Sequence, residues 1–252
     1  MKGFFVQDLK RSFLNPGFFV GIAAIGVLLF AALITGAPLD RSRSSYYILF
    51  NVFGASGFSP FAAVFPVLAY ATNFCEEYQS GYYRMIFSRM TPIHFGRIRM
   101  ITVALSGGVM LALPIALVCI AAFIFGIPGV PQGSDEGMLQ GMVMLTYIEK
   151  YGDWYIVVGK TVLGFLFGCV WALVGLAFAV WIPNRYVALI APFVLYESMW
   201  LGLSEIPLLN PIRLLRGDDL NSYPLSAGME CVYLAVVSVI IIAGLVRRYR
   251  NG

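Results

Sequence analysis

The chain has 252 residues, of which 60% are hydrophobic and 12% are charged. Soluble domains carry about 25% charged residues, so this composition excludes an ordinary soluble protein and indicates an integral membrane protein. The formal net charge of +4 does not indicate a nucleic-acid-binding protein, because the arginines cluster beside apolar runs of membrane-spanning length.

Six apolar runs are long enough to cross a bilayer as helices, which requires about 17 to 25 residues. They lie at about 17–37, 58–75, 101–125, 154–182, 186–203 and 228–246. The sequence therefore predicts an all-α membrane protein, with six transmembrane helices in a single transmembrane domain over residues 1–252.

The leader before the first predicted span, residues 1–16, is amphipathic. Phe5, Leu9 and Phe13 recur at helical spacing against a basic remainder. This pattern predicts a helix that lies in the membrane interface.

Small residues mark the third and fourth predicted spans. Ser106-Gly107-Gly108 lets another backbone approach closely, and Pro114 is tolerated as a kink. Gly164, Gly168 and Ala172 form a stripe suited to helix contact, either within one subunit or between two.

Polar segments connect the later spans. Residues 127–153 are predicted to be an external loop with room for a surface helix, because their central apolar stretch is too short to cross. Pro183-Asn184-Arg185 predicts a tight turn. Residues 204–227 are amphiphilic but interrupted by prolines, so they are predicted to lie on the external side without crossing.

The basic residues predict the orientation. Six spans place both termini on one side, together with residues 76–100 and the turn at Arg185. That side holds eleven of the seventeen basic residues: Lys2, Lys10, Arg11, Arg84, Arg89, Arg97, Arg99, Arg185, Arg247, Arg248 and Arg250. Because basic residues accumulate on the cytoplasmic side, we expect a multi-pass protein of the cell membrane with both termini in the cytoplasm.

Residues 76–100 form a basic and aromatic segment between the second and third spans. Tyr78, Tyr82, Ile86 and Met90 recur every fourth residue and so predict one face of an amphipathic helix. Thr91-Pro92 should end that helix and provide the N-cap and first residue of another.

This layout resembles the cytoplasmic loop between spans two and three of ATP-binding-cassette exporter permeases of the type-2 class. The matching positions are Glu76, Glu77, Gly81, Thr91, Pro92, Gly96 and Arg97. The alternative interpretation is an ordinary cytoplasmic loop that is basic only because of the orientation rule.

The resemblance implies a transport subunit rather than an enzyme. Residues 1–16 would be the elbow helix of the family, and residues 204–227 its external re-entrant element. A coupling helix would rest on a separate ATPase subunit through Glu76, Glu77, Tyr78, Gly81, Tyr82, Arg84, Thr91 and Pro92. No cofactor is expected on this chain, because ATP would be bound by the partner ATPase. A second permease chain, identical or related, would complete the path within the lipid bilayer.

Glu197 lies near the middle of the fifth predicted span, where a carboxylate costs about 2.5 to 3.5 kcal/mol. It should therefore face protein or water. The resemblance makes it a candidate path or dimer-interface residue, and a hydrogen-bonded packing residue is the alternative.

Other functions have weaker support. A stand-alone six-span channel or ion-driven carrier would require several charged residues within the spans or an inverted repeat. A rhomboid-like intramembrane protease is a remote alternative suggested by Gly54-Ala55-Ser56-Gly57, but the only histidine, His94, is predicted to lie across the membrane from Ser56.

Two further patterns are not expected to form sites. Gly159-Lys160-Thr161 lacks the first glycine of a phosphate-binding loop, and Lys160 is predicted to extend to the outer interface. The four cysteines have no paired short spacing and are expected to be apolar fillers: Cys75, Cys119, Cys169 and Cys231.

Overall fold

The computed structural model describes residues 2–35, 43–87, 90–129, 142–217 and 221–251. Within these ranges every regular element is an α-helix, and the one β-type contact is an isolated bridge between Ser44 and Ile127. The predicted all-α class is therefore confirmed. The described ranges leave out residue 1 of the predicted interfacial helix, 36–37 of the first predicted span and 88–89 of the predicted coupling segment. They also leave out 130–141 of the predicted external loop and 218–220 of the predicted external element.

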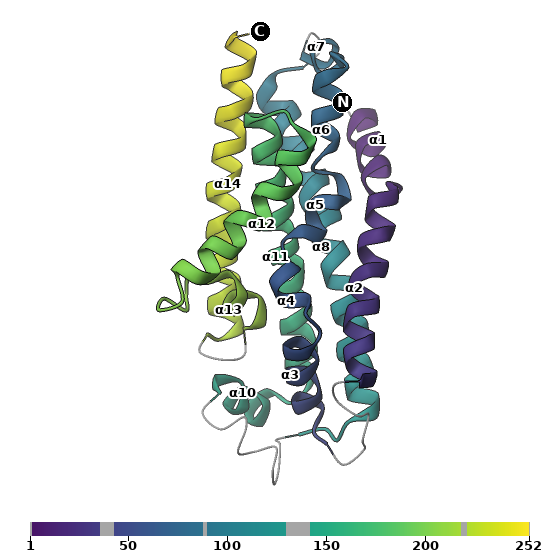
Figure 1. The fold of residues 1–252 in the computed structure, drawn as a ribbon, viewed down its shortest axis with the longest axis vertical. Helices are drawn as coiled ribbons and strands as arrows, with labels where there is room; N and C mark the ends of the chain where they lie inside the picture. The colour runs from purple at the N-terminus through teal and green to yellow at the C-terminus, as the bar shows by residue number, and fades with distance from the viewer. Residues whose placement is uncertain (1, 36–42, 88–89, 130–141, 218–220, 252) are drawn as a thin grey trace.

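The helices are named in Figure 1. In chain order they are α1 (Lys2–Phe13), α2 (Pro16–Thr35), α3 (Ser45–Ala55), α4 (Phe58–Phe61), α5 (Val64–Tyr70), α6 (Asn73–Gln79), α7 (Tyr82–Phe87), α8 (Pro92–Phe125), α10 (Val143–Tyr151), α11 (Trp154–Trp181), α12 (Arg185–Gly202), α13 (Pro211–Arg216) and α14 (Tyr223–Asn251).

Four of these helices are long and apolar enough to cross a membrane, namely α2, α8, α11 and α14. They make the chain an all-helical protein of membrane-spanning character. The predicted fifth span corresponds to α12, which has 18 residues, includes Arg185 and Glu197, and is not among these four. The total of six spans remains a prediction.

The second predicted span differs most from the expectation. A single helix over 58–75 is wrong, because α4, α5 and α6 follow one another as short helices, with α3 before them (Figure 1). Gly57 at φ +64° separates α3 from α4, and Pro60 and Pro66 lie in the first turns of α4 and α5. A proline has no N–H to continue a preceding helix but fits a first turn, so each one favours a new start.

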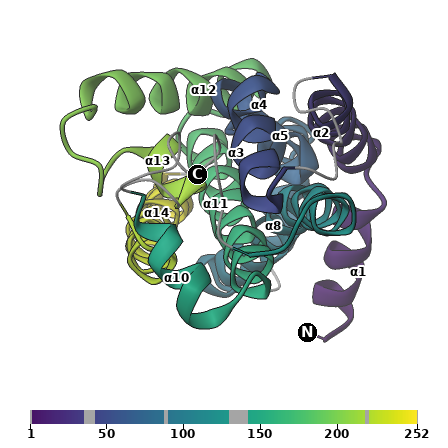
Figure 2. The same ribbon diagram turned by 90° about the horizontal axis from the view of Figure 1, so that it is seen from below.

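Helix α11 is the centre of the bundle (Figure 2). In its apolar stretch 72% of the residues are buried, against 22% in α14. Helix α8 packs closely along it, since a Cβ at Gly107 would overlap Ala172 and lie 2.8 Å from the carbonyl oxygen of Gly168. The small-residue stripe therefore serves packing inside one subunit, which decides between the two roles predicted for it.

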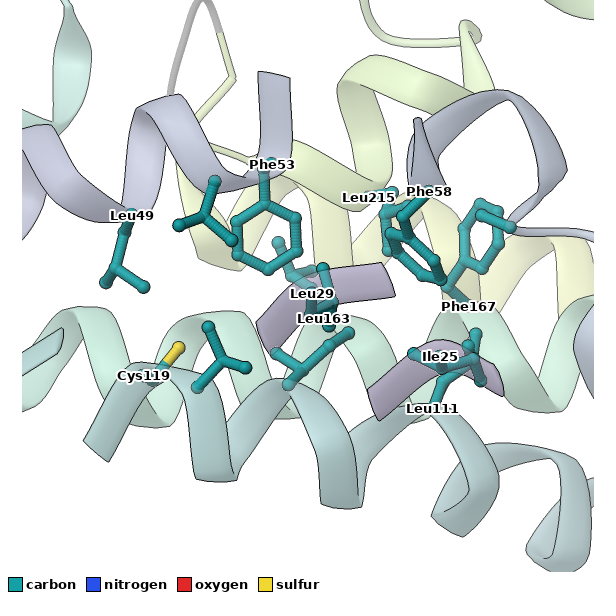
Figure 3. Close-up of a cluster of buried hydrophobic side chains, with 14 of the residues drawn as sticks. Ile25, Leu29, Leu49, Phe53, Phe58, Leu111, Cys119, Leu163, Phe167 and Leu215 are labelled. Atoms are coloured by element: carbon teal, nitrogen blue, oxygen red, sulfur yellow. The ribbon is translucent and has the colours of Figure 1, made fainter. Parts of the chain in front are cut away.

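One large apolar cluster fills the middle of the bundle (Figure 3). Ile25 and Leu29 of α2 and Phe53 of α3 lie against Leu163 and Phe167 of α11. Cys119 lies in the same cluster, and all four cysteines are free thiols.

The two ends of the bundle are different. Both termini lie at the end that carries α7, whereas α10 lies at the opposite end beside the start of α3 (Figure 1). Helix α10 provides the surface helix for which the predicted external loop 127–153 had room. Helix α13 lies within the predicted external element, where Asn210 accepts a hydrogen bond from the N–H of Ile212 at 3.2 Å.

Candidate functional site

The predicted coupling segment lies at the end of the bundle where both termini lie (Figure 1). Its first half is two helices, α6 and α7, so the single helix predicted from the four-residue spacing is wrong. The break occurs at Gly81, whose φ of +72° is in the left-handed region. Only glycine adopts this conformation without steric cost, and Gly81 therefore turns the chain between the two helices.

Helix α8 begins as predicted. The Thr91 hydroxyl accepts a hydrogen bond from the N–H of His94 at 3.4 Å, and Pro92 is the first helical residue. The helix continues through Pro114 for 34 residues, a length of about 51 Å. This exceeds the ~30 Å hydrocarbon core, so α8 joins the predicted coupling segment to a candidate span without interruption.

A buried ionic cluster lies directly behind α6. Arg99 of α8 is 2% exposed and forms salt bridges with Asp8 of α1, at 2.8 Å, and with Glu77 of α6. The hydroxyls of Tyr70 and Thr102 each donate to the Asp8 carboxylate at 2.7 Å. The guanidinium also stacks over the Tyr70 ring, 4.8 Å from its centroid. These five residues, called the Arg99 cluster below, tie α1, α5, α6 and α8 together.

Sequence reasoning did not find the Arg99 cluster. Asp8 and Arg99 are 91 residues apart, and each looks like an ordinary charge beside an apolar run. The available signal was Arg99-x-x-Thr102, which places two polar side chains one turn apart inside an otherwise apolar stretch.

The residues predicted to contact an ATPase are divided between the surface and the interior. Glu76 is exposed and pairs with Arg185 at 3.1 Å, whereas Glu77 is held inside by Arg99. Tyr78 stacks on Tyr83 with a centroid distance of 4.7 Å and also lies under Arg248.

Among the aromatic residues predicted for docking, Tyr82 is the one with a large exposed fraction, 39%. Glu77 and Tyr78 therefore serve internal contacts, which corrects the expectation that Glu77 and Tyr78 are exposed. The side chain of Arg84 lies outside the described part of the structure.

The surface beside Tyr82 forms a depression that is lined by both polar and apolar residues. A depression of about 420 Å³ is lined by Arg11, Glu76, Glu77, Ser80, Tyr82 and Met85. Met85 is 67% exposed and lies one turn beyond Tyr82 on α7. We call Arg11, Glu76, Ser80, Tyr82 and Met85 the docking face, since it combines two exposed apolar anchors with polar groups at their edge.

Glu197 lies on α12 at the periphery of the bundle (Figure 2). Its carboxylate has one buried oxygen, Oε1, with no hydrogen-bond partner among the described residues. Its neighbour Tyr196 points inward and donates to the carbonyl of Ser59 at 2.6 Å, whereas Val194 and Leu201 are exposed apolar residues. Glu197 thus borders an apolar outer surface.

Two charged residues of the predicted outer half lie deeper than expected. Lys160 is 2% exposed and donates to the carbonyl of Arg216 at 2.8 Å, so the prediction that it extends to the interface is wrong. Glu230 of α14 lies near the outer end of the sixth predicted span, where its position predicts an interfacial residue, but it is 1% exposed. One Glu230 oxygen, Oε2, has no partner among the described residues.

The structure does not bring together Ser56 and His94, the two residues of the rhomboid-like alternative. Ser56 ends α3 and accepts from the N–H of Phe58 at 3.3 Å, whereas His94 lies in the first turn of α8 beyond α4, α5 and α6 (Figure 1). In the ranges that the structure describes, no group of three His, Cys, Asp or Glu residues could hold a metal ion.

No protein-family model, no curated protein and no solved structure matches this chain.

Proposed function

We propose that this chain is the membrane-spanning subunit of an ATP-driven exporter and that a separate ATPase drives it through α6 and α7. The observation that carries the proposal is the docking face, whose exposed Tyr82 and Met85 lie at the end that holds both termini. A soluble partner could reach these side chains if that end is cytoplasmic, as the excess of basic residues predicts.

The Arg99 cluster would transmit a force on α6 to the neighbouring helices α1 and α8. Glu77 ties α6 to Arg99 of α8, and Asp8 ties α1 to the same guanidinium. A push on α6 would therefore move α1, the proposed elbow helix, together with the long helix α8. Because α8 extends into the bilayer, a closing ATPase could convert its motion into alternating access of the path.

The proposal includes six spans and two permease chains. The two spans beyond α2, α8, α11 and α14 would be α12 and the α3 to α6 column, and residues 204–227 would form the external re-entrant element. Glu197 would lie where a second chain covers α12, because a carboxylate bordering an apolar surface is costly in contact with lipid. The partner chain would thus complete both the path and the surroundings of Glu197.

The experiment measures partner binding and coupled ATP turnover. The chain is co-expressed with a candidate ATPase subunit that carries Walker motifs, and the complex is reconstituted into membranes. Tyr82→Ala should weaken ATPase binding by about 30-fold, since an aromatic hot spot contributes about 2 kcal/mol. Tyr249→Ala is the matched control, because Tyr249 is also exposed, at 55%, near the C-terminus. Equal ATPase occupancy and equal turnover for both variants would refute the docking role.

Buried charges favour an ion-driven carrier as the second candidate function. Glu230 and Lys160 add to Glu197, so the described part of the chain holds more charge within the bundle than the sequence predicted. A carrier would transport in response to an ion gradient in vesicles that contain this chain alone. Transport that requires the ATPase and ATP would exclude the carrier.

A further inference from the structure

Three arginines gather where α14 reaches the end of the bundle that holds both termini: Arg247, Arg248 and Arg250. Arg248 is fixed, because its guanidinium donates to the backbone carbonyls of Val180 and, at 2.8 Å, Trp181. Arg247 lies over the Trp181 ring, 5.4 Å from its centroid. The C-terminal end of α11 thus contacts two guanidinium groups, those of Arg247 and Arg248.

Arg247 separates two hollows. One has a volume of about 280 Å³ and is lined by Tyr78, Tyr83, Val180, Trp181, Gly244, Arg247 and Arg248. The other is a groove of about 600 Å³ along α14, lined by Val239, Ile242, Ala243 and Val246 and ended by Arg247 and Arg250. The groove residues recur at three- and four-residue spacing and so form one helical face. An apolar stretch of the α14 surface therefore leads directly to the arginine pair Arg247 and Arg250.

The charge at this place is not balanced by neighbouring acids. Among the residues that the structure describes, neither Arg247 nor Arg250 makes a salt bridge. The carboxylate of Glu76 is paired with Arg185. The arginine pair at the end of the groove therefore retains its positive charge for an anion.

We propose that this groove binds an anionic phospholipid of the inner leaflet. One acyl chain lies along Val239, Ile242 and Val246, and Arg247 and Arg250 bind the phosphate group. A guanidinium presents donors in a planar fork that matches phosphate oxygens, and basic residues next to the cytoplasmic end of a span attract anionic head groups. Trp181, under Arg247, is a residue type that is common at the level of the head groups.

A second copy of the chain fits the groove along α14 less well than a phospholipid does. A twofold contact through this face would bring two sets of the same arginines together, because both partners in such an interface use the same patch. A phospholipid satisfies both parts of the site, the apolar groove and the positive charge at its end. This inference does not depend on the proposed ATPase, since it requires only a membrane leaflet with anionic head groups at this end.

The test compares spin-labelled phosphatidylglycerol with spin-labelled phosphatidylcholine in phosphatidylcholine vesicles that contain the full chain. The measured quantity is the preference for phosphatidylglycerol among the lipids immobilised by the protein. Arg247→Gln and Arg250→Gln should each lower this preference by about fivefold, and the double variant by about 30-fold. Arg97→Gln is the matched control, because Arg97 is exposed at the same end and its loss removes the same charge.

The groove is tested separately. Ala243→Trp should fill the groove and lower the immobilised fraction of both lipids, whereas Val232→Trp, on the same face of α14 but outside the groove, should not. Unfolding midpoints of the variants show whether each one is folded, and Arg247→Lys keeps the charge if Arg247→Gln does not fold.

Three results would overturn the proposal. Equal immobilisation of the two lipids by the unaltered chain would show that no anionic lipid is selected. An equal loss of preference in Arg97→Gln would show that the overall positive charge of this end attracts the lipid, and not the specific pair Arg247 and Arg250. Displacement of phosphatidylglycerol by millimolar inorganic phosphate would show a phosphate ion site.

Discussion

Removal of Asp8 is the most direct test of the Arg99 cluster. Asp8→Ala removes one of the two carboxylates that pair with Arg99 and leaves the hydroxyl of Tyr70 without its acceptor, whereas the Thr102 hydroxyl keeps the carbonyl of Arg99 at 3.0 Å. Asp8 is 3% exposed and Arg99 is 2% exposed, so water does not easily replace the lost partner. We therefore expect a large loss in the free energy of unfolding.

The expected magnitude follows from burial. Removing one partner of a buried ion pair costs about 3 to 5 kcal/mol when the remaining charge is left uncompensated. Arg99 keeps its salt bridge with Glu77 in this variant, so the expected loss is at the lower end of that range, about 3 kcal/mol. The pair between Glu76 and Arg185 provides the comparison, because these side chains are 58% and 64% exposed. Glu76→Ala should cost at most about 1 kcal/mol, since water already solvates that pair.

A double variant separates pairing from other effects. Arg99→Met alone leaves the Asp8 and Glu77 carboxylates without their shared cation. Asp8→Ala combined with Arg99→Met should cost less than the sum of the two single changes, by about 1 to 3 kcal/mol, because the second change removes a charge that has already lost a partner.

The assay is equilibrium unfolding in mixed micelles of a mild detergent and dodecyl sulfate, followed by the fluorescence of the four tryptophans. Each variant is compared with the unaltered chain at the same protein concentration. If Asp8→Ala and Glu76→Ala lower the free energy of unfolding equally, the buried cluster does not hold α1 against α8.

Three further predictions concern orientation, packing and Glu197. In a variant without the native cysteines, Lys150→Cys should react with a membrane-impermeant thiol reagent on intact cells and Tyr249→Cys should not; the reverse labelling would invert the proposed orientation. Gly168→Leu should lower the free energy of unfolding by about 1 to 3 kcal/mol, because its side chain would overlap Gly107, whereas Gly54→Leu meets open space; equal losses would contradict the packing account. Glu197→Ala should preserve ATPase binding and alter transport, and normal transport would favour a packing role.

The sequence predicted those parts of the fold that depend on local chemistry. The apolar runs identified α2, α8, α11 and α14, because hydrophobic length alone determines whether a helix can cross a membrane. Thr91 and Pro92 predicted the start of α8, since capping depends on adjacent residues.

Features that depend on contacts between distant segments could not be predicted. The spacing of Tyr78 and Tyr82 favoured one helix, but Gly81 adopts a positive φ and ends α6 first. Glu77 looked like a surface acid because nothing in the sequence states that Arg99 lies beside it. Which of two adjacent acids faces inward is decided by the packing of α6 against α8.

The separation of Asp8 from Arg99 has a consequence for biosynthesis. The two residues are 91 positions apart, so a ribosome that adds 5 to 20 residues per second needs about 5 to 18 s to reach Arg99 after Asp8. During that interval α1 has no cation with which to bury its carboxylate. Helix α1 can therefore dock against α8 through this ion pair only after α8 has been made.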